Sequence, residues 1–299
     1  MWTSGGVYRL PSRELLAKQY AACQECGRFR TGLDALPPNC DVCGHAWRIR
    51  TWVCPEFGFV AERKTSDAGS EPPKRIWNSA TYVEDMGPDA SEQSLVGAGG
   101  RALRVTVGTR GRLTVINEGR NGAGFLICQW CGRGLSRAGK TPAVHTHLFS
   151  GKDCSGPLDN RSLAHSFQTD VLAIDLDGVG RVRYDQALSM LYAVLEAAAD
   201  LLQLSRDDLD GTIDVSVSGL RLVLFDTVPG GAGAVVAICE RLAEVMEAAQ
   251  RRVSTCTCGE ETSCYACLRG FRNQRVHDRL SRDGARTLLR EVAIGPGGG

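Results

Sequence analysis

The chain has 299 residues, of which 43% are hydrophobic and 23% are charged, a composition typical of globular domains with a substantial core. Its 35 basic and 34 acidic residues leave a formal net charge of +1, which excludes a global electrostatic attraction to nucleic acid or to a membrane. Any such attraction has to be local. No apolar run reaches the roughly 18 residues that a helix needs to cross a bilayer.

Thirteen cysteines, an odd number with several C-x-x-C spacings, indicate metal binding in a reducing compartment rather than a secreted disulfide framework. The residues after Met1 have neither the basic region nor the apolar region of a signal peptide. We therefore expect a cytoplasmic protein with no membrane partner.

The first cysteines lie in two knuckles, Cys23-Gln-Glu-Cys26-Gly and Cys40-Asp-Val-Cys43-Gly, with thirteen residues between Cys26 and Cys40. Each glycine permits the tight turn that directs backbone amides toward the sulfurs, and four thiolates at this spacing can form a tetrahedral zinc site. The sequence therefore predicts an N-terminal zinc ribbon over residues 1–65 with these four ligands. Cys54 lacks a second cysteine at knuckle spacing, so we expect it to be buried or spare.

Residues 66–100 are polar and rich in Gly, Pro and Ser, which predicts a linker or a surface excursion with one candidate strand at residues 75–82. Two alternating segments, 102–107 and 112–117, flank Gly108-Thr-Arg-Gly111 and predict a β-hairpin. A further strand begins at Phe125 and leads into the next pair of cysteines.

The second cysteine cluster is Cys128-Gln-Trp-Cys131-Gly, followed by His145, His147 and Cys154. Two cysteines, one histidine and a final cysteine would complete a tetrahedral zinc site. The spacing leaves both histidines open. We give a slight preference to His147 as the ligand and expect the other histidine at the surface. A zinc-bound imidazole also needs an acceptor for its second nitrogen, which a sequence does not reveal.

The segment Gly134-Leu-Ser-Arg-Ala-Gly139-Lys140-Thr141 matches the phosphate-binding pattern G-x-x-x-x-G-K-T, and Asp175 is available as an acidic partner for magnesium. A phosphate loop has to leave a buried strand and open a helix. Here a metal knuckle precedes the segment and Pro142 follows it, so we interpret the match as coincidence and the segment as a basic excursion.

The second half of the chain alternates strands with helices. Strands are predicted at 165–175, 213–217 and 220–225, and helices at 185–204 and 234–252. A glycine-rich turn, Asp226-Thr-Val-Pro-Gly-Gly-Ala-Gly233, precedes the last long helix. Free amides at such a turn can bind an anion, here through Gly230, Gly231 and Gly233. In the alternative interpretation the glycines only allow close packing, and Asp226 makes a structural hydrogen bond.

The last cysteine cluster, Cys256-Thr-Cys-Gly-Glu-Glu-Thr-Ser-Cys264-Tyr-Ala-Cys267, again has a spacing that suits one tetrahedral metal ion. Many arginines follow it, and Tyr265 and Phe271 are candidates for base stacking. We predict a local cationic surface for nucleic acid, formed by Arg269, Arg272, Arg275, Arg279 and Arg282. A short helix begins near Ser281.

Together these elements predict an α/β (α+β) fold that contains about three zinc ions. A zinc ribbon is followed by a mixed β-sheet domain with two long helices and further zinc knuckles. The predicted divisions are a ribbon at 1–65, a linker at 66–100, a zinc-binding α/β domain at 101–294 and a flexible tail at 295–299.

Several blocks of this sequence, in one order, resemble the MrfA-type zinc-binding (MZB) domain over about residues 100–290. They are Asn117-Glu-Gly119, residues 124–132, residues 167–172, residues 226–233, and the closing cysteine string with Asn273, Gln274 and His277. That domain occurs in DEAD/DEAH-type helicases linked to DNA repair and in DrmB of the DISARM anti-phage system. The resemblance implies that the domain's zinc ligands are Cys256, Cys258, Cys264 and Cys267.

The resemblance implies a role beside a DNA-translocating motor, yet this chain has no D-E-x-H motif. We therefore expect a non-catalytic accessory subunit, or a detached carboxyl-terminal part, of a superfamily-two-type helicase that engages DNA in defence or repair. The alternatives are a nucleotide-binding enzyme that uses residues 134–141, and a purely structural interaction module. Homo-oligomerisation is left open.

Overall fold

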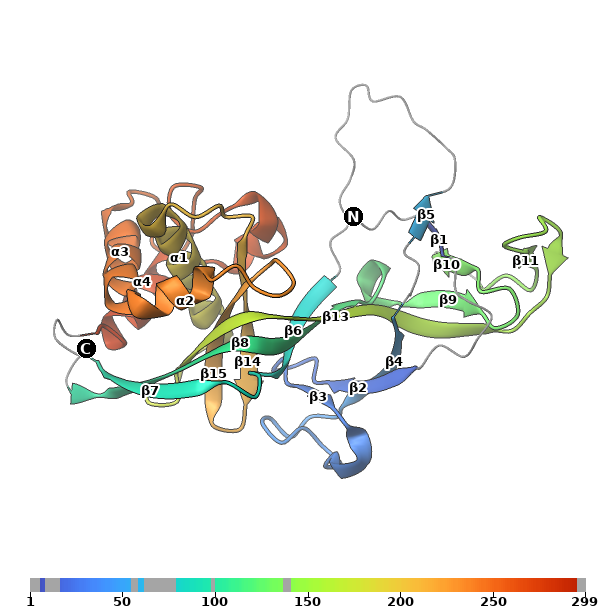
Figure 1. The fold of residues 1–299 in the computed structure, drawn as a ribbon, viewed down its shortest axis with the longest axis horizontal. Coiled ribbons are helices and arrows are strands. Elements are labelled where there is room, and N and C mark those ends of the chain that lie inside the picture. Colours follow the sequence, from blue (N-terminus) through green and yellow to red (C-terminus); the bar gives the residue numbers. More distant parts are fainter. Residues whose placement is uncertain are drawn as a thin grey trace, which may run out of the picture.

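In the computed structural model, one mixed sheet of 11 strands runs through the molecule. A helical layer covers one end of this sheet, and a small lobe extends from the other end (Figure 1). The structure describes residues 6–8, 17–54, 59–61, 79–97, 100–136 and 141–294. In these ranges no helix is long and apolar enough to span a bilayer. The predicted α+β fold class is confirmed.

Strand β13 (Leu158–Asp175) connects all parts of the sheet. It pairs successively with β9 (Phe125–Cys128), with β8 (Ala102–Asn117) and β4 (Arg48–Val53), and with β15 (Gly219–Asp226). The pairing with β4 is parallel and the other three are antiparallel. A strand of 18 residues spans about 60 Å. The single strand β13 is therefore long enough to connect the ribbon, the helical layer and the lobe.

Strand β8 is continuous over 16 residues, so the predicted hairpin around Gly108 and Gly111 is wrong. A Cβ atom on Gly108 would lie 2.2 Å from the Met86 carbonyl oxygen, and one on Gly111 would lie 2.3 Å from Val171 Cγ2. The glycines therefore let neighbours pack closely against the strand instead of turning it. The register between β13 and β8 shifts near Thr169, opposite these glycines, which indicates a β-bulge at this place.

Strands β6 (Ser79–Asp85) and β7 (Ser91–Val96) pair with the two halves of β8. Both strands lie within the predicted linker, so residues 79–85 and 91–96 are part of the sheet and not of a linker or surface excursion. Residues 62–78 and 98–99 lie outside the described ranges, as does the predicted tail at 295–299. Two short strands, β1 (Gly6–Tyr8) and β5 (Phe59–Ala61), form a separate antiparallel pair.

The ribbon is continuous with the main sheet. Strand β2 (Lys18–Ala22) pairs with β3 (Phe29–Thr31) and with β4, which in turn pairs with β13. Tyr20 on β2 is fully buried, and its hydroxyl donates to Glu118 Oε1 at 2.6 Å and lies 2.9 Å from Ser162 Oγ. The contact with Ser162 is buried, so the ribbon is attached by side chains as well as by backbone pairing.

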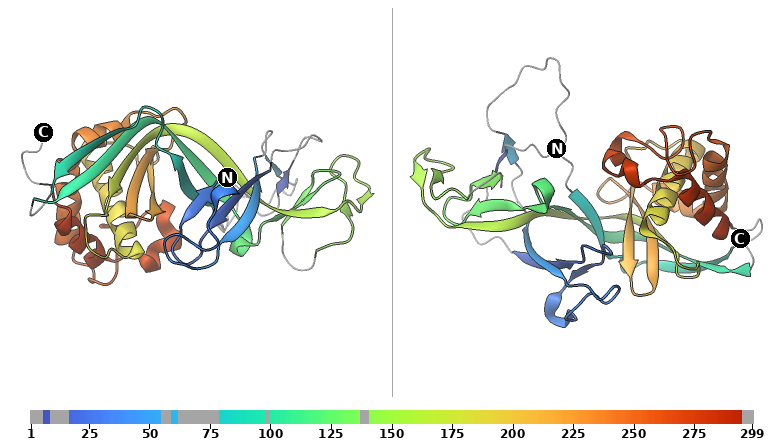
Figure 2. Two further views of the ribbon diagram at one scale, coloured as in Figure 1. Left: turned by 90° about the horizontal axis from the view of Figure 1, so that it is seen from below. Right: turned by 180° about the vertical axis from the view of Figure 1, so that it is seen from behind.

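The helical layer packs on β14 (Leu209–Ser216) and β15, which form a hairpin. It consists of α1 (Tyr184–Leu202), α2 (Ala234–Glu240), α3 (Leu242–Thr255) and α4 (Arg282–Glu291), and it stays at one end of the sheet in every view (Figure 2). The predicted helix at 234–252 is interrupted at Arg241, whose φ of −118° and ψ of 28° are not helical. The 3-10 segment η4 (Phe271–Arg279) precedes α4.

Candidate metal centres and neighbouring surfaces

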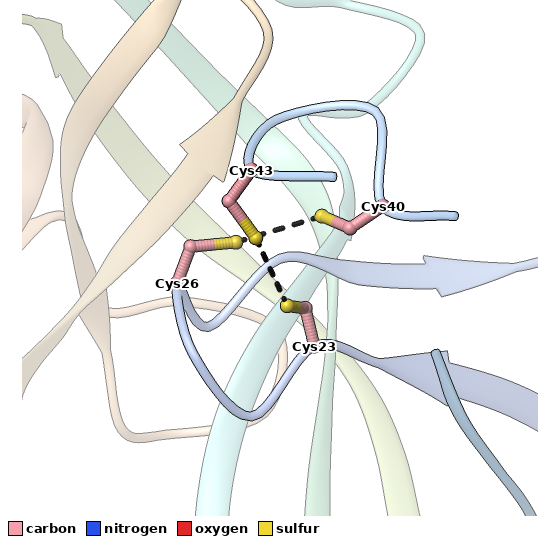
Figure 3. Close-up of side chains that lie close together, drawn as sticks. All are labelled: Cys23, Cys26, Cys40 and Cys43. Atoms are coloured by element: carbon pink, nitrogen blue, oxygen red, sulfur yellow. Dashed lines mark hydrogen bonds between the residues drawn. The ribbon is translucent and has the colours of Figure 1, made fainter. Parts of the chain in front are cut away.

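Four ribbon residues form the first tetrad: Cys23, Cys26, Cys40 and Cys43. They lie on two similar turns, in which Gly27 N donates to Cys23 O at 3.0 Å and Gly44 N donates to Cys40 O at 2.9 Å. Both glycines have a positive φ, 81° and 75°. Cys23 Sγ is 3.4 Å from Cys43 Sγ, and Cys26 Sγ is 3.6 Å from Cys40 Sγ (Figure 3). Zinc–sulfur bonds of about 2.3 Å in a tetrahedron require sulfurs about 3.8 Å apart, so the arrangement suits zinc.

The second tetrad lies in the lobe: Cys128, Cys131, His145 and Cys154, all buried. Cys128 Sγ is 3.8 Å from Cys154 Sγ, and Cys131 Sγ is 3.4 Å from His145 Nε2. The short strands β11 (His145–Thr146) and β12 (Asp153–Cys154) pair so that the histidine lies opposite the last cysteine. This backbone pairing places the last two ligands next to each other.

His145 occupies the histidine position of this tetrad, so the sequence-based preference for His147 is corrected. Burial, together with the nearby Arg133 charge, lowers the pKa of His145. This shift favours the neutral imidazole, which is the form that binds a metal ion. Its Nδ1 is buried and has no hydrogen-bond partner among the described residues, which leaves the outer nitrogen of the ligand without the usual acceptor.

His147 instead organises a turn with the backbone pattern of a metal knuckle. Its amide donates to Lys152 O at 2.7 Å and its carbonyl accepts from Gly151 N at 3.2 Å, as Cys128 does with Arg133 O and Gly132 N. The amides of Phe149 and Ser150 donate to His147 Nδ1 at 3.2 and 3.3 Å. The imidazole nitrogen thus takes the place that a cysteine sulfur has in the other knuckles.

The third tetrad follows the end of α3: Cys256, Cys258, Cys264 and Cys267. Four sulfur pairs lie between 3.5 and 3.7 Å apart. Cys267 is fully buried in the main hydrophobic core with the residues of α1, so this site is part of the helical layer. The structure therefore brings together every cysteine that was predicted as a ligand.

The thiols of the third tetrad influence one another strongly. Burial raises the pKa of the Cys264 thiol, but hydrogen bonds from Cys256 and from the Ala266 amide outweigh it and lower the pKa to about 7. Burial and the neighbouring thiols raise the pKa of Cys267 to about 12. Four negative sulfurs at these distances repel one another, so a bound cation is needed to keep them all ionised.

Two of the arginines predicted as a nucleic-acid surface form ion pairs at the surface. Arg272 lies 2.8 Å from Asp207, and Arg279 lies 2.7 Å from Asp185. Both arginines stay more than 40% exposed. Exposed ion pairs are weak, contributing about 0–1 kcal/mol, so a phosphate could compete for either guanidinium.

The remaining three arginines of that prediction are held by the chain itself. Arg269 Nε donates to Ser263 Oγ at 3.0 Å, and Arg275 donates to the Ser79 carbonyl. Arg282 is 7% exposed and donates to a backbone carbonyl at the end of α3. A buried guanidinium cannot reach a phosphate group, so Arg282 is removed from the predicted surface.

The glycine-rich turn after β15 already contains an anion, the carboxylate of Asp226. Asp226 Oδ2 accepts from Ala232 N at 2.6 Å and from Ala234 N at 3.0 Å, while Oδ1 accepts from Val235 N at 3.0 Å. The residue is fully buried. These are the amides that an external phosphate would have used.

The amides of Gly230, Gly231 and Gly233 are also engaged. They donate to Gln168 O, to Val228 O and to Asp170 Oδ2. Burial raises the pKa of Asp170, the Gly233 amide opposes this shift, and the charge of Asp226 adds to it. The anion-binding prediction at these glycines is therefore contradicted, and the structural alternative describes the turn.

The phosphate-loop-like segment begins in β10 (Gly134–Ser136), which pairs with β9 in the lobe. Residues 137–140, including Lys140, lie outside the described ranges. From Thr141 onward the described chain leads into β11 and not into a helix. A phosphate loop needs the N-terminus of a helix at this point, so the geometry agrees with the interpretation as coincidence.

Comparison with known protein families relates the third tetrad to a described domain. Residues 190–268 match the MrfA Zn-binding domain. The match runs from within α1 to the residue after Cys267, and so includes the whole third tetrad. The resemblance to this domain is confirmed over these residues, while the DISARM setting stays a prediction.

Beyond the MrfA Zn-binding domain, the chain is similar to Druantia protein DruE of Escherichia coli (strain UMEA 4076-1). The two are 26% identical over 313 residues, which is 93% of this chain and 17% of that relative. This chain thus spans about a sixth of its length. Crystal structures of the DUF1998 helicase MrfA bound to DNA, and bound to DNA and AMPPNP, have TM-scores of 0.42 and 0.32. They are 15% and 11% identical and cover 72% and 71% of this chain, and 25% and 22% of theirs.

The donor sets of the three tetrads fit about three zinc ions. Thiolate sulfur and imidazole nitrogen in a tetrahedron are the ligands of structural zinc. The four protein ligands in each tetrad would complete the coordination sphere of a tetrahedral zinc ion. Cys54 and Cys239 are the cysteines outside these groups.

Inspection of the sequence missed two features of the site. The first is the knuckle-like turn of His147. The sequence indicates this turn by Gly151, which follows His147 by four residues, just as a glycine follows the first cysteine of each C-x-x-C-G knuckle by four residues. The second is a pair of exposed aromatic side chains on the lobe, Trp130 and Phe149, which are 68% and 62% exposed. Exposure depends on tertiary packing, so only the position of Trp130 between two cysteine ligands pointed to it.

Proposed function

We propose that this chain is a non-catalytic, zinc-stabilised region of a DEAD/DEAH-type helicase system. It docks on the motor and contributes to DNA engagement, in anti-phage defence or DNA repair. The observation that carries the proposal is the match of residues 190–268 to the MrfA Zn-binding domain, together with a complete third tetrad at its end. The similarity to DruE supports the same assignment.

The chemistry of the tetrads supports a structural role. Each holds four protein ligands, and closed thiolate sites of this kind stabilise folds instead of activating water. The zinc ions would fix the ribbon, the lobe and the helical layer relative to one sheet. A rigid platform of this shape suits a docking and DNA-guiding part of a motor.

Purification of the tagged chain from its native operon tests the docking part of the proposal. We expect a superfamily-two-type helicase to be retained with the zinc-replete chain and to be lost from the Cys256→Ser variant, because the third tetrad supports the helical layer. Cys54→Ser is the matched control, since that cysteine is exposed and outside the tetrads. Retention of no helicase by the wild-type chain contradicts the docking role.

An ATP turnover assay separates the proposal from a nucleotide-binding enzyme. The purified chain is expected to show no turnover above background, with or without DNA. Lys140→Ala is the informative variant because the lysine of a phosphate loop contacts the transferred phosphates. A measurable rate that this substitution abolishes would replace the proposed function by the enzymatic alternative.

A further inference from the structure

The lobe that carries the second tetrad, residues 128–136 and 141–156, lies at the end of the molecule opposite the helices (Figures 1 and 2). It presents two large aromatic side chains to solvent, Trp130 at 68% and Phe149 at 62% exposure. Aromatic rings of this size are normally buried or used in contacts, because exposing them is unfavourable. The turn of Trp130 contains the ligands Cys128 and Cys131, and the turn of Phe149 lies between the ligands His145 and Cys154.

The backbone of Trp130 is held in place, while its indole ring is exposed to solvent. It lies between the ligands Cys128 and Cys131, and its amide donates to Cys128 Sγ at 3.4 Å. A Cβ atom on Gly156 would come within 2.9 Å of Trp130 Cγ, so the absent side chain of this glycine makes room for the start of the indole. The metal site therefore sets the direction in which the ring projects.

Phe149 is presented by the knuckle-like turn of His147. The imidazole accepts the amides of Phe149 and Ser150, and the turn is closed by the bond from His147 N to Lys152 O. His145, two residues earlier, is a ligand of the same metal site. The turn thus has a rigid attachment, and the exposed Lys152 lies on the same short loop as the phenyl ring.

The lobe is also a local exception to the nearly neutral charge of the chain. Over residues 128–156 the sequence contains four basic residues, Arg133, Arg137, Lys140 and Lys152, against one acidic residue, Asp153. Of the two in the described part of the lobe, Arg133 donates to the Thr146 carbonyl at 3.0 Å, and Lys152 is exposed. Asp153 is the one acidic residue in the described lobe.

We propose that this lobe binds single-stranded DNA, with Trp130 and Phe149 stacking on unpaired bases and Lys152 beside the phosphates. Proteins that hold single strands without sequence preference combine aromatic stacking platforms with basic side chains. Duplex DNA does not offer base faces to such rings, so the lobe selects unpaired strands. The proposal deepens the proposed function and rests on its statement that the chain engages DNA.

Fluorescence anisotropy with the full, zinc-replete chain tests the proposal. The probes are a labelled oligo-dT strand of about 12 nucleotides and a labelled duplex of the same length. Stacking contributes about 1–3 kcal/mol per base, so Trp130→Ala or Phe149→Ala should weaken single-strand binding about 5- to 150-fold. Trp130→Phe should restore most of the affinity, and duplex binding should not change.

Tyr265→Ala and Phe271→Ala are the matched controls, because these aromatics are 63% and 56% exposed near the third tetrad. Zinc content should be unchanged in all four alanine variants. A loss of single-strand affinity in the controls, with none in the lobe variants, overturns the lobe proposal while DNA engagement stands. Absence of DNA binding by the wild-type chain, even at low salt with its helicase, overturns both.

Lys152→Ala tests the phosphate contact, and anionic vesicles separate binding of nucleic acid from binding of a lipid surface. Loss of one phosphate contact to a single strand should reduce the slope of log affinity against log salt by about 0.7. If Trp130→Ala abolishes binding to anionic vesicles but leaves oligo-dT binding unchanged, the lobe is a membrane surface and the proposal is overturned.

Discussion

At the scale of single residues, identity alone did not decide which side chains act as ligands. His145 and His147 differ by two positions, yet one lies 3.4 Å from Cys131 Sγ and the other accepts two amides of its own turn. Asp226 shows the same dependence on surroundings. Its carboxylate, and not an external phosphate, receives the amides at the start of α2.

The two histidines make a matched pair of variants. His145→Ala removes a ligand of the second tetrad, so the zinc content of the purified chain should fall from about three to about two ions after dialysis against a mild chelator. His147→Ala removes only a hydrogen-bond acceptor and should keep all the zinc. Metal analysis by mass spectrometry checks both values. Loss of zinc from the His147 variant alone would restore the preference that the sequence suggested.

Asp226→Asn tests the buried carboxylate. The substitution places an amide donor against backbone amides that need an acceptor, and removes the charge from three hydrogen bonds. We expect a loss of stability of about 3 kcal/mol, measured from the urea midpoint of the zinc-replete chain. Glu247→Gln is the control, because this glutamate is 70% exposed and its pair with Arg251 should contribute less than about 0.5 kcal/mol.

At the scale of elements, a glycine can indicate a place where a neighbouring segment packs closely against a strand, as well as a turn. Gly108-Thr-Arg-Gly111 is typical of a hairpin, yet β8 continues through it for 16 residues. Gly108 and Gly111 pair with β13, the Thr109 amide donates to Asp89 Oδ2, and β6 and β7 pair with the flanking parts of β8 on its other side. Met86 lies so close to Gly108, and Val171 so close to Gly111, that neither position has room for a larger side chain.

A double-mutant cycle at Gly111 and Val171 tests this explanation. Gly111→Ala introduces a methyl group 2.3 Å from Val171 Cγ2 and should cost about 1–3 kcal/mol through overpacking. In a Val171→Ala background the same methyl has room, so its cost should be smaller by at least about 0.5 kcal/mol. Equal costs in the two backgrounds would show that the glycine is needed for another reason.

At the scale of the whole molecule, the three tetrads hold different layers of one structure. The first tetrad belongs to the ribbon, where Arg28 also donates to Val215 O of β14 at 2.7 Å. The third contributes Cys267 to the core of the helical layer. The predicted divisions at 1–65 and 101–294 therefore share a continuous sheet through β4 and β13.

Removal of single zinc ions should consequently have unequal effects. Cys267→Ser places a polar group in the core and opens the third tetrad, so we expect loss of the cooperative thermal transition seen by circular dichroism. Cys40→Ser should release one zinc ion and expose the ribbon to proteases, while the helical layer still melts cooperatively. Cys54→Ser, at an exposed cysteine, should change neither property. Identical behaviour of the Cys40 and Cys267 variants would contradict this division.

The sequence by itself determined the features that depend on neighbours along the chain. The cysteine knuckles, the long helix at α1, the presence of two strands at β14 and β15, and the mixed fold class follow from spacing and periodicity, because turns and helices are formed by residues a few positions apart. Only the tertiary structure decided which histidine is a ligand, that Arg282 is buried, and that β8 continues through its glycines. Each of these depends on burial and on pairing between segments far apart in the chain. Local sequence patterns do not indicate which distant residues will contact one another.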